Sequence, residues 1–190
     1  MGLDISIRTD KDNEILDENY FIEENNFFNL HSLSRTFCNF ICRKHMVEIP
    51  ELNQIGKITK IDIEAIYQME EYPNEDELEY ELEFAENECE RIEILKTAEF
   101  NKSKLSGNLK VVLETISEII ISLSKIEKLQ ELLDDNQEDT LNNKTYFSAY
   151  NEDKGRGYID NNFGQDLRNF QRFLIYAKEK GANTTWFEYN

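Results

Sequence analysis

Alternating apolar and polar residues near both ends of the chain predict a small antiparallel sheet. The alternation is strict over 2–8, and the closing segment TTWFEY (184–189) has the β-branched and aromatic composition of a strand. Two further strands are expected at TYFSAY (145–150) and GYID (157–160), on either side of the turn-forming sequence NEDKGRG. The pattern therefore indicates a mostly antiparallel sheet built from the N- and C-terminal ends.

Apolar residues at helical spacing predict helices between these strands. One is expected over 32–46, capped by Ser32, and another over 63–72, with EIPELNQIGK (48–57) as a loop between them. Asn162, followed three residues later by Gln165, resembles a capping box and predicts a helix that stops at Gly181.

Two long apolar stripes predict a helical hairpin over about 75–134. The first stripe steps by four and three, and the second is richer and runs over 109–133, with NKSKLSGN (101–108) as the connection. The first stripe consists of Leu78, Leu82, Ala85, Cys89 and Ile92. The expected fold class is α+β, in a single domain over 1–190 on which the hairpin protrudes or packs.

Acidic residues concentrate in the first arm of this predicted hairpin. The formal net charge of the chain is -18, and 70–93 holds twelve acidic residues against Arg91 as the single basic one. On a helix this density is about one negative charge per 3 Å, close to the phosphate spacing of one DNA strand. Such a chain repels nucleic acids and anionic membranes, so a basic protein is the expected partner and direct nucleic-acid binding is not expected.

Tyr80 and Phe84 lie nearly opposite the first apolar stripe, among the acids. A helix that buries one face has no need of aromatic residues on the other, so either both faces are covered or the outer face meets a partner. A solvated helix face and a cation site are the competing interpretations. The residues expected to bind a partner are Glu79, Tyr80, Glu83, Phe84, Glu86 and Glu90.

A row of His, Arg and Cys residues is the most chemically suggestive spacing in the chain. His31, Arg35, Cys38, Cys42 and His45 are separated by 4, 3, 4 and 3, which places them on one face of a helix that includes His31. The interpretations are small core residues, a ligand pocket, a metal site and a Cys–His catalytic pair. Because no third group orients the pair and one helix face rarely encloses a metal, no catalytic or metal-binding residue is assigned.

Aromatic residues and arginines crowd the C-terminal quarter and suggest an alternative function. Stacking and charge-assisted hydrogen bonds from such residues suit a planar anionic ligand, such as a nucleotide signal held by a sponge protein. No Walker or dinucleotide-binding motif is present. The ligand-binding residues expected on this alternative are His31, Arg35, His45, Arg156, Arg172 and Trp186.

The opening MGLDISI resembles small uncharacterised bacterial and phage proteins that begin with MGLD and an apolar strand. SLSRTFCNFICRKH and TTWFEYN stand where those proteins have a short helix and a final aromatic strand. The resemblance covers about a third of the chain and implies a phage or mobile-element setting, but no activity.

The expected function is that of a non-enzymatic protein that binds and inhibits a basic host protein involved in defence or acting on DNA. A Cys/His enzyme is the third hypothesis, after the ligand binder. The absence of a signal peptide or apolar span and the three cysteines predict a cytoplasmic protein. No cofactor is expected, and the helical hairpin is a surface through which two copies could associate.

Overall fold

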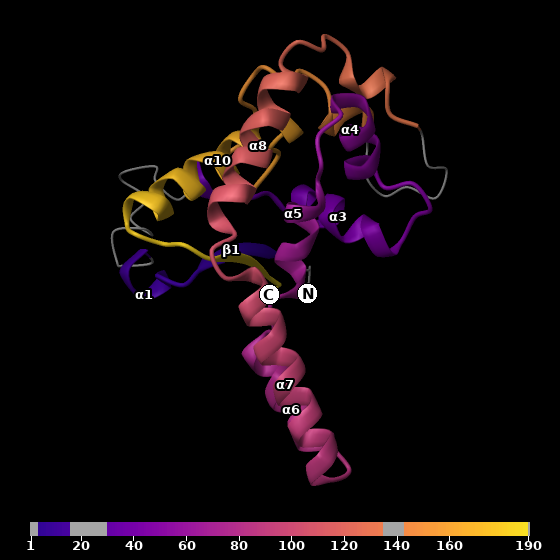
Figure 1. Cartoon of the computed structure of the whole chain (residues 1–190). Helices are drawn as coiled ribbons and strands as arrows, with labels where there is room; N and C mark the ends of the chain where they lie inside the picture. The colour runs from indigo at the N-terminus through magenta and orange to yellow at the C-terminus, as the bar shows by residue number, and fades with distance from the viewer. Residues whose placement is uncertain (1–3, 16–29, 135–142, 190) are drawn as a thin grey trace.

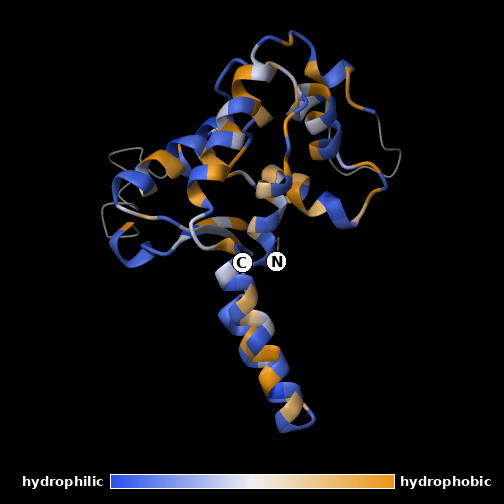
Figure 2. Ribbon diagram, viewed as in Figure 1, coloured by the Kyte–Doolittle hydropathy of each residue, from blue (hydrophilic) through white to orange (hydrophobic). Residues whose placement is uncertain are grey.

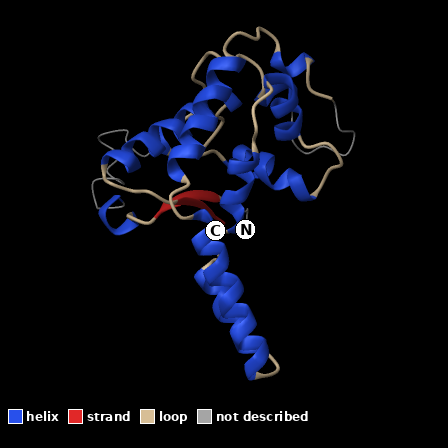
Figure 3. Ribbon diagram, viewed as in Figure 1, coloured by secondary structure: helices blue, strands red, loops and turns tan. Residues whose placement is uncertain are grey.

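The computed structural model describes residues 4–15, 30–134 and 143–189, and the statements below refer to these residues. The fold is α+β, as the sequence predicts, with helices predominating over a single pair of strands in this part of the chain (Figure 3). Its elements are, in order, β1 (Ile5–Thr9), α1 (Asp12–Ile15), α3 (Arg35–Cys42), η3 (Arg43–His45), α4 (Glu51–Thr59), α5 (Glu64–Gln68), η4 (Met69–Glu71), α6 (Glu75–Phe84), α7 (Glu88–Leu105), α8 (Leu109–Leu123), η5 (Leu129–Glu131), α9 (Asn143–Tyr146), α10 (Phe163–Glu179) and β2 (Thr185–Tyr189).

The sheet joins the two ends of the chain. β1 and β2 run antiparallel, with Ile5 opposite Tyr189 and Ile7 opposite Phe187. Ile5, Ile7 and Phe187 are buried, because alternate residues of a strand point to the same face. The prediction of an antiparallel sheet from the two ends is therefore confirmed, although residues 1–3 of the first predicted strand lie outside the described residues.

The core lies where α8 and α10 pack along each other above the sheet (Figure 1). α10 follows the predicted cap, since the Asn162 side chain accepts a hydrogen bond from the Gln165 amide, and Gly181 just beyond it has the positive φ of a C-terminal glycine. Around these helices is a group of buried aromatic rings: Phe37, Phe40, Phe147, Phe163, Phe170 and Phe187.

Two helical segments differ from the prediction. Ser34, not Ser32, caps the first helix, and its hydroxyl accepts a hydrogen bond from the Phe37 amide at 3.2 Å. The expected loop EIPELNQIGK instead contains the start of α4. A side chain at Gly56 would place its Cβ 3.2 Å from the Ile61 carbonyl oxygen, so this glycine permits a close approach of the chain rather than a loop.

The predicted strands at 145–150 and 157–160 are wrong. This region forms α9 followed by turns, with no strand among its described residues. Tyr146, Phe147 and Tyr150 gather around Phe163 instead of alternating across a sheet. Their aromatic composition therefore reflects core packing, which propensity alone does not distinguish from a strand.

A helical hairpin is present, but it turns earlier than predicted and its arms are shorter. The arms are α6 and α7, joined by a break at 85–87, whereas α8 belongs to the body of the molecule. The hairpin projects away from the body, from a base that lies beside the sheet (Figure 1). The break lies inside the acidic segment, because Asn87 caps a new helix there.

Candidate functional site

The projecting hairpin is built by two asparagine caps. The Asn74 side chain accepts a hydrogen bond from the Asp76 amide at 2.9 Å, and that of Asn87 accepts one from the Glu90 amide at 3.0 Å. The Glu90 carboxylate reaches back to the Glu86 amide at 2.7 Å. Each cap satisfies amides that a helix start leaves unpaired, and the acids that follow complement the helix dipole.

Contacts at the base hold the hairpin to the sheet. Tyr72 stacks on Trp186 of β2 with ring centroids 3.9 Å apart and an angle of 11°. Lys104, near the end of α7, forms an ion pair with Glu71 at 2.5 Å. The attachment therefore lies at the residues just before α6 and at the end of α7, and the rest of the hairpin is left free of the body.

No residue of the hairpin belongs to the main hydrophobic core cluster, although every one of its residues is described. α6 has no buried residue, and those of α7 are Ala98 and Leu105. Tyr80 and Phe84 are 63% and 64% exposed, and their rings pack on each other with centroids 4.5 Å apart. Hydrophobic residues are thus displayed along the hairpin between hydrophilic ones (Figure 2).

The six residues expected to bind a partner all lie exposed on the far part of the hairpin. Glu79, Tyr80, Glu83 and Phe84 are on α6, Glu86 is in the break, and Glu90 is in the first turn of α7. The predicted buried stripe does not continue through this region, because the break changes the helical phase. Cys89 and Ile92 are consequently exposed.

Sequence reasoning missed a second set of exposed hydrophobic residues on α7. Leu95 and Phe100 are 50% and 66% exposed, and Ile92 is exposed as well. Ile94 and Ala98 instead line a cleft of about 220 Å³ that α6 and α7 enclose near the base, together with Leu78. The signal was present in the sequence, since apolar residues of α7 occur on more than one face of the helix.

Charge divides the hairpin along its length. The acids of α6 are followed at the far end by Glu86, Glu88 and Glu90, whereas the basic residues of α7 include Lys102 and Lys104 near the base. Lys104 is already paired with Glu71. The far end therefore combines the strongest negative charge with the exposed Tyr80–Phe84 pair.

The residues expected to bind a small ligand are dispersed and largely engaged in other contacts. Arg35 donates to Asp4 at 2.8 Å and to the Tyr158 hydroxyl at 2.6 Å. The hydrogen bonds that Arg35 and the Tyr158 hydroxyl donate to Asp4 lower the pKa of the Asp4 carboxyl. His31 packs against Tyr176 at a centroid distance of 6.1 Å, and Trp186 stacks beneath the hairpin.

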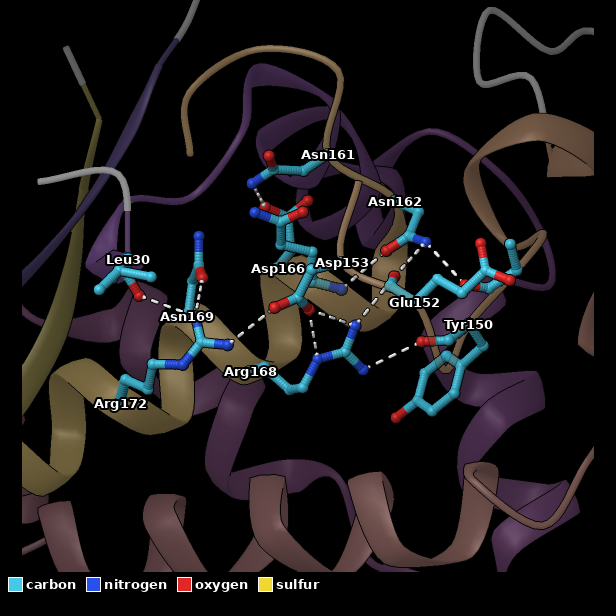
Figure 4. Close-up of polar contacts among 12 residues, drawn as sticks. Leu30, Tyr150, Glu152, Asp153, Asn161, Asn162, Asp166, Arg168, Asn169 and Arg172 are labelled. Atoms are coloured by element: carbon cyan, nitrogen blue, oxygen red, sulfur yellow. Dashed lines mark hydrogen bonds and ion pairs between the residues drawn. The ribbon is translucent and has the colours of Figure 1, made fainter. Parts of the chain in front are cut away.

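The arginines of α10 tether the loop that precedes it. Arg172 donates to Asn169 at 2.6 Å and pairs with Asp153 at 3.2 Å, as Figure 4 shows. Arg168 pairs with the same Asp153 and donates to the Tyr150 carbonyl at 2.9 Å. These guanidinium groups thus bind the protein's own backbone and side chains. Arg156 lies exposed in the loop that precedes α10.

The His and Cys row is interrupted by the non-helical residues 32–34 that precede α3. His31 precedes Ser34 and does not share the helix, whereas Cys38 and Cys42 lie on α3 and His45 ends η3. His45 lies 3.5 Å from the Glu70 carboxylate, which the Tyr189 hydroxyl also contacts at 2.5 Å. The third group that the sequence did not identify near Cys42 and His45 is therefore Glu70.

A second groove, of about 540 Å³, lies along α4 and α5. Lys44, Lys57 and Glu64 are among its lining residues, and the Lys44 amine lies 4.4 Å from the centre of the Tyr67 ring. Neither this groove nor the hairpin cleft is lined by a residue of the predicted ligand site.

Comparison with known proteins provides no relative from which the function of the site could be inferred. Searches of protein-family models, curated proteins and solved structures give no match to this chain. Within the described ranges, no group of three or more His, Cys, Asp or Glu residues is arranged to hold a metal ion. In the same residues, no helix has both the length and the apolar character needed to cross a membrane.

Proposed function

We propose that the protein is a non-enzymatic interaction protein whose acidic hairpin binds a basic partner protein. The observation that carries the proposal is the hairpin itself, which projects from the body, adds no residue to the main core cluster and displays a pair of aromatic rings among carboxylates. An element that does not stabilise the body through the core, yet exposes apolar side chains, has the features of a binding surface.

The charge at the far end defines the chemistry of the partner. Glu79, Glu83 and Glu90 are exposed, and a basic surface would neutralise them. Long-range attraction of this kind accelerates encounter and selects the partner more than it adds affinity. A second copy of the chain would bring like charges together, which disfavours self-association through this end.

The aromatic pair supplies the contact that charge alone does not. Tyr80 and Phe84 are one helical turn apart and already in contact, so little side-chain freedom remains to be lost on binding. Each ring would bury apolar surface in a pocket of the partner, surrounded by charge pairs at the rim. The hairpin would then act as an anchor with two rings and an acidic border.

The resemblance to small bacterial and phage proteins, and the phage or mobile-element setting that it implies, make a host defence or DNA-acting protein the expected partner. Such proteins carry basic surfaces for nucleic acids, and the acidic arm has a charge density near that of a DNA strand. Occupation of that surface would inhibit the host protein without any chemical step.

Capture of bacterial proteins on the immobilised full chain tests the proposal. We expect a basic protein to be retained at roughly 50 mM salt and released at roughly 300 mM, because salt screens exposed charges. Reversal of Glu79, Glu83, Glu86 and Glu90 to Lys should weaken binding of that protein at least about tenfold. Tyr80→Ser with Phe84→Ser should weaken it by a similar factor without changing the salt dependence.

The matched control reverses four exposed acids elsewhere, namely Glu114, Glu118, Glu127 and Glu131. This variant has the same net charge as the hairpin variant and should bind as the wild type does. Equal loss of binding in both variants would show that net charge, not the hairpin, is responsible. Retention of the partner by the hairpin variant, or the absence of any salt-sensitive partner, would contradict the proposal.

A further inference from the structure

We propose that the outer face of α7 is a self-association surface, on which a second copy of the chain packs in the antiparallel direction. The two-fold axis of the pair passes beside Leu95. The surface lies on α7, whereas the Tyr80–Phe84 pair lies on α6. The inference therefore does not depend on the proposed basic partner.

The outer face of α7 is the side turned away from α6. Ile94, Ala98 and Asn101 line the cleft between the two helices, which fixes the inner side of α7. Ile92 and Leu95 lie on the other side and are 43% and 50% exposed. The residues of the outer face follow one another at steps of four and three: Glu88, Ile92, Leu95, Glu99 and Lys102. The face thus has an apolar centre between charged ends.

The charges of α7 have opposite signs on the two sides of Leu95. In an antiparallel pair centred there, residues equally far before and after Leu95 come opposite each other. Arg91 then faces Glu99 of the second copy, and each such contact occurs twice because of the symmetry. Glu88 faces Lys102 in the same way. Over 86–104, no two equidistant residues carry charges of the same sign, so the face is complementary to itself.

Other arrangements of the same two helices juxtapose like charges. In a parallel pair each residue faces its own copy, so acids meet acids and bases meet bases. A second antiparallel register would place Ile92 opposite Leu95 and join the apolar residues directly. That register brings Arg91 against Lys96 of the other copy. Because opposed like charges reject the wrong arrangement, the pattern selects one direction and one register.

The outer face is accessible in the single chain. Arg91 and Glu99 are exposed, and neither belongs to an ion pair within the described part of the chain. Lys102 is half-buried, with its amine 5.9 Å from the centre of the Tyr72 ring. The hairpin projects from the body, so an antiparallel pair would carry its two bodies at opposite ends (Figure 1). Neither body then obstructs the contact.

The length of α7 limits the strength of the association. Its 18 residues span about 27 Å at about 1.5 Å per residue. A single helix contact of this length is smaller than a standard interface, which buries about 800 Å² on each partner. We therefore expect a reversible dimer with a dissociation constant on the order of 10 µM.

Sedimentation velocity of the full chain tests the proposal. In roughly 150 mM salt, which screens the net charge of the two copies, the monomer should convert to a dimer between about 1 and 200 µM. Arg91→Glu and Glu99→Arg each oppose like charges twice and should weaken the dimer at least about tenfold. An equimolar mixture of the two variants should dimerise as the wild type does, because every new charge then meets one of opposite sign.

The matched control is Lys125→Glu, an exposed site after α8. It changes the net charge as Arg91→Glu does and should dimerise as the wild type does. A wild type that stays monomeric at about 200 µM would overturn the proposal. Loss of the dimer in the control, or a mixture of the two α7 variants that stays monomeric, would overturn it as well.

Cysteine cross-linking distinguishes the antiparallel pair from a parallel one. In a Cys89→Ser background, Leu95→Cys should give a covalent dimer on mild oxidation, because the axis brings both copies of position 95 together. Ser103→Cys in the same background should not, since position 103 then lies opposite Asn87. A parallel pair would cross-link at both positions. Cross-linking at 103, or none at 95, therefore rejects the proposed arrangement.

Discussion

At the scale of single residues, Asp166 is the buried carboxylate that joins several elements of the core. Its carboxylate accepts hydrogen bonds from the Ser34 amide and hydroxyl at 2.9 and 2.6 Å and from the Tyr146 hydroxyl at 2.8 Å. It also accepts one from the Asn161 side chain at 2.8 Å, which Figure 4 shows. These contacts join the start of α10 to the cap of α3 and to the loop before α10. The carboxylate is fully buried, so its charge is costly in spite of the four donors.

This burial has a consequence for stability that depends on pH. Burial raises the pKa of Asp166 to about 6, while the donors limit the rise. A carboxyl whose pKa is raised by folding stabilises the fold below its unfolded value, near pH 4, and that contribution is lost as pH rises through 6. At about 1.36 kcal/mol per pH unit, the loss amounts to about 3 kcal/mol.

The variant Asp166→Asn isolates this contribution because asparagine does not titrate. The wild type should exceed the variant in unfolding free energy at pH 4, and the difference should shrink by about 3 kcal/mol by pH 7. Urea denaturation of both proteins across this range measures it. A difference that stays constant or grows with pH would show that the four donors outweigh burial.

At the scale of elements, the same kind of cap has different consequences in α7 and α10. Asn87 and Asn162 each accept a hydrogen bond from an amide three residues later. α10 lies in the core, whereas α7 projects from the body and shares no residue with the core cluster. The Asn162 cap should therefore contribute to the global stability of the body, whereas the Asn87 cap should affect only local unfolding of the hairpin.

We expect Asn87→Ala and Asn162→Ala to separate local from global stability. Loss of either cap costs about 1 kcal/mol. In Asn87→Ala, amide exchange in the first turn of α7 should be about fivefold faster, with the thermal midpoint of the body unchanged. In Asn162→Ala the midpoint itself should fall by a few degrees. A fall of the midpoint in Asn87→Ala would mean that the hairpin unfolds together with the core.

Elements with strong local signals could be predicted from the sequence, and those whose residues are explained by packing contacts could not. Alternation identified β1, and the Asn162 cap identified α10. The break in the hairpin was also encoded, since Asn87 followed by Glu90 is a capping pattern, but the run of acids obscured it. The helix that contains Gly56 could not be predicted, because this glycine reads as a loop residue. The structure explains it by the close approach of the Ile61 carbonyl oxygen.

The candidate site divides in the same way. The position of Tyr80 and Phe84 opposite the apolar stripe left two possibilities, a covered face or an exposed one. The structure shows both side chains exposed. The contact of Tyr189 with Glu70 joins residues 119 positions apart, so no local spacing announces it. Glu70, the group near Cys42 and His45, could therefore be identified only from the three-dimensional structure.

At the scale of the whole molecule, the chain separates structural and interaction roles. The body holds the sheet, the core helices and the polar network of Asp166, whereas 75–105 holds exposed aromatic residues and a large share of the acids. The two meet at the Tyr72–Trp186 stack and the Lys104–Glu71 ion pair. This arrangement implies that the hairpin can be removed without loss of the body.

Replacement of 76–102 by a short Gly/Ser linker tests this implication. The ends to be joined lie close together, since Glu71 and Lys104 are in contact across the base. The body should retain its thermal midpoint within about 5 °C, because the removed residues add nothing to the core. Capture of the basic partner should be abolished. A body that loses its cooperative unfolding would show instead that the hairpin is part of the fold, and persistent partner binding would place the interaction elsewhere.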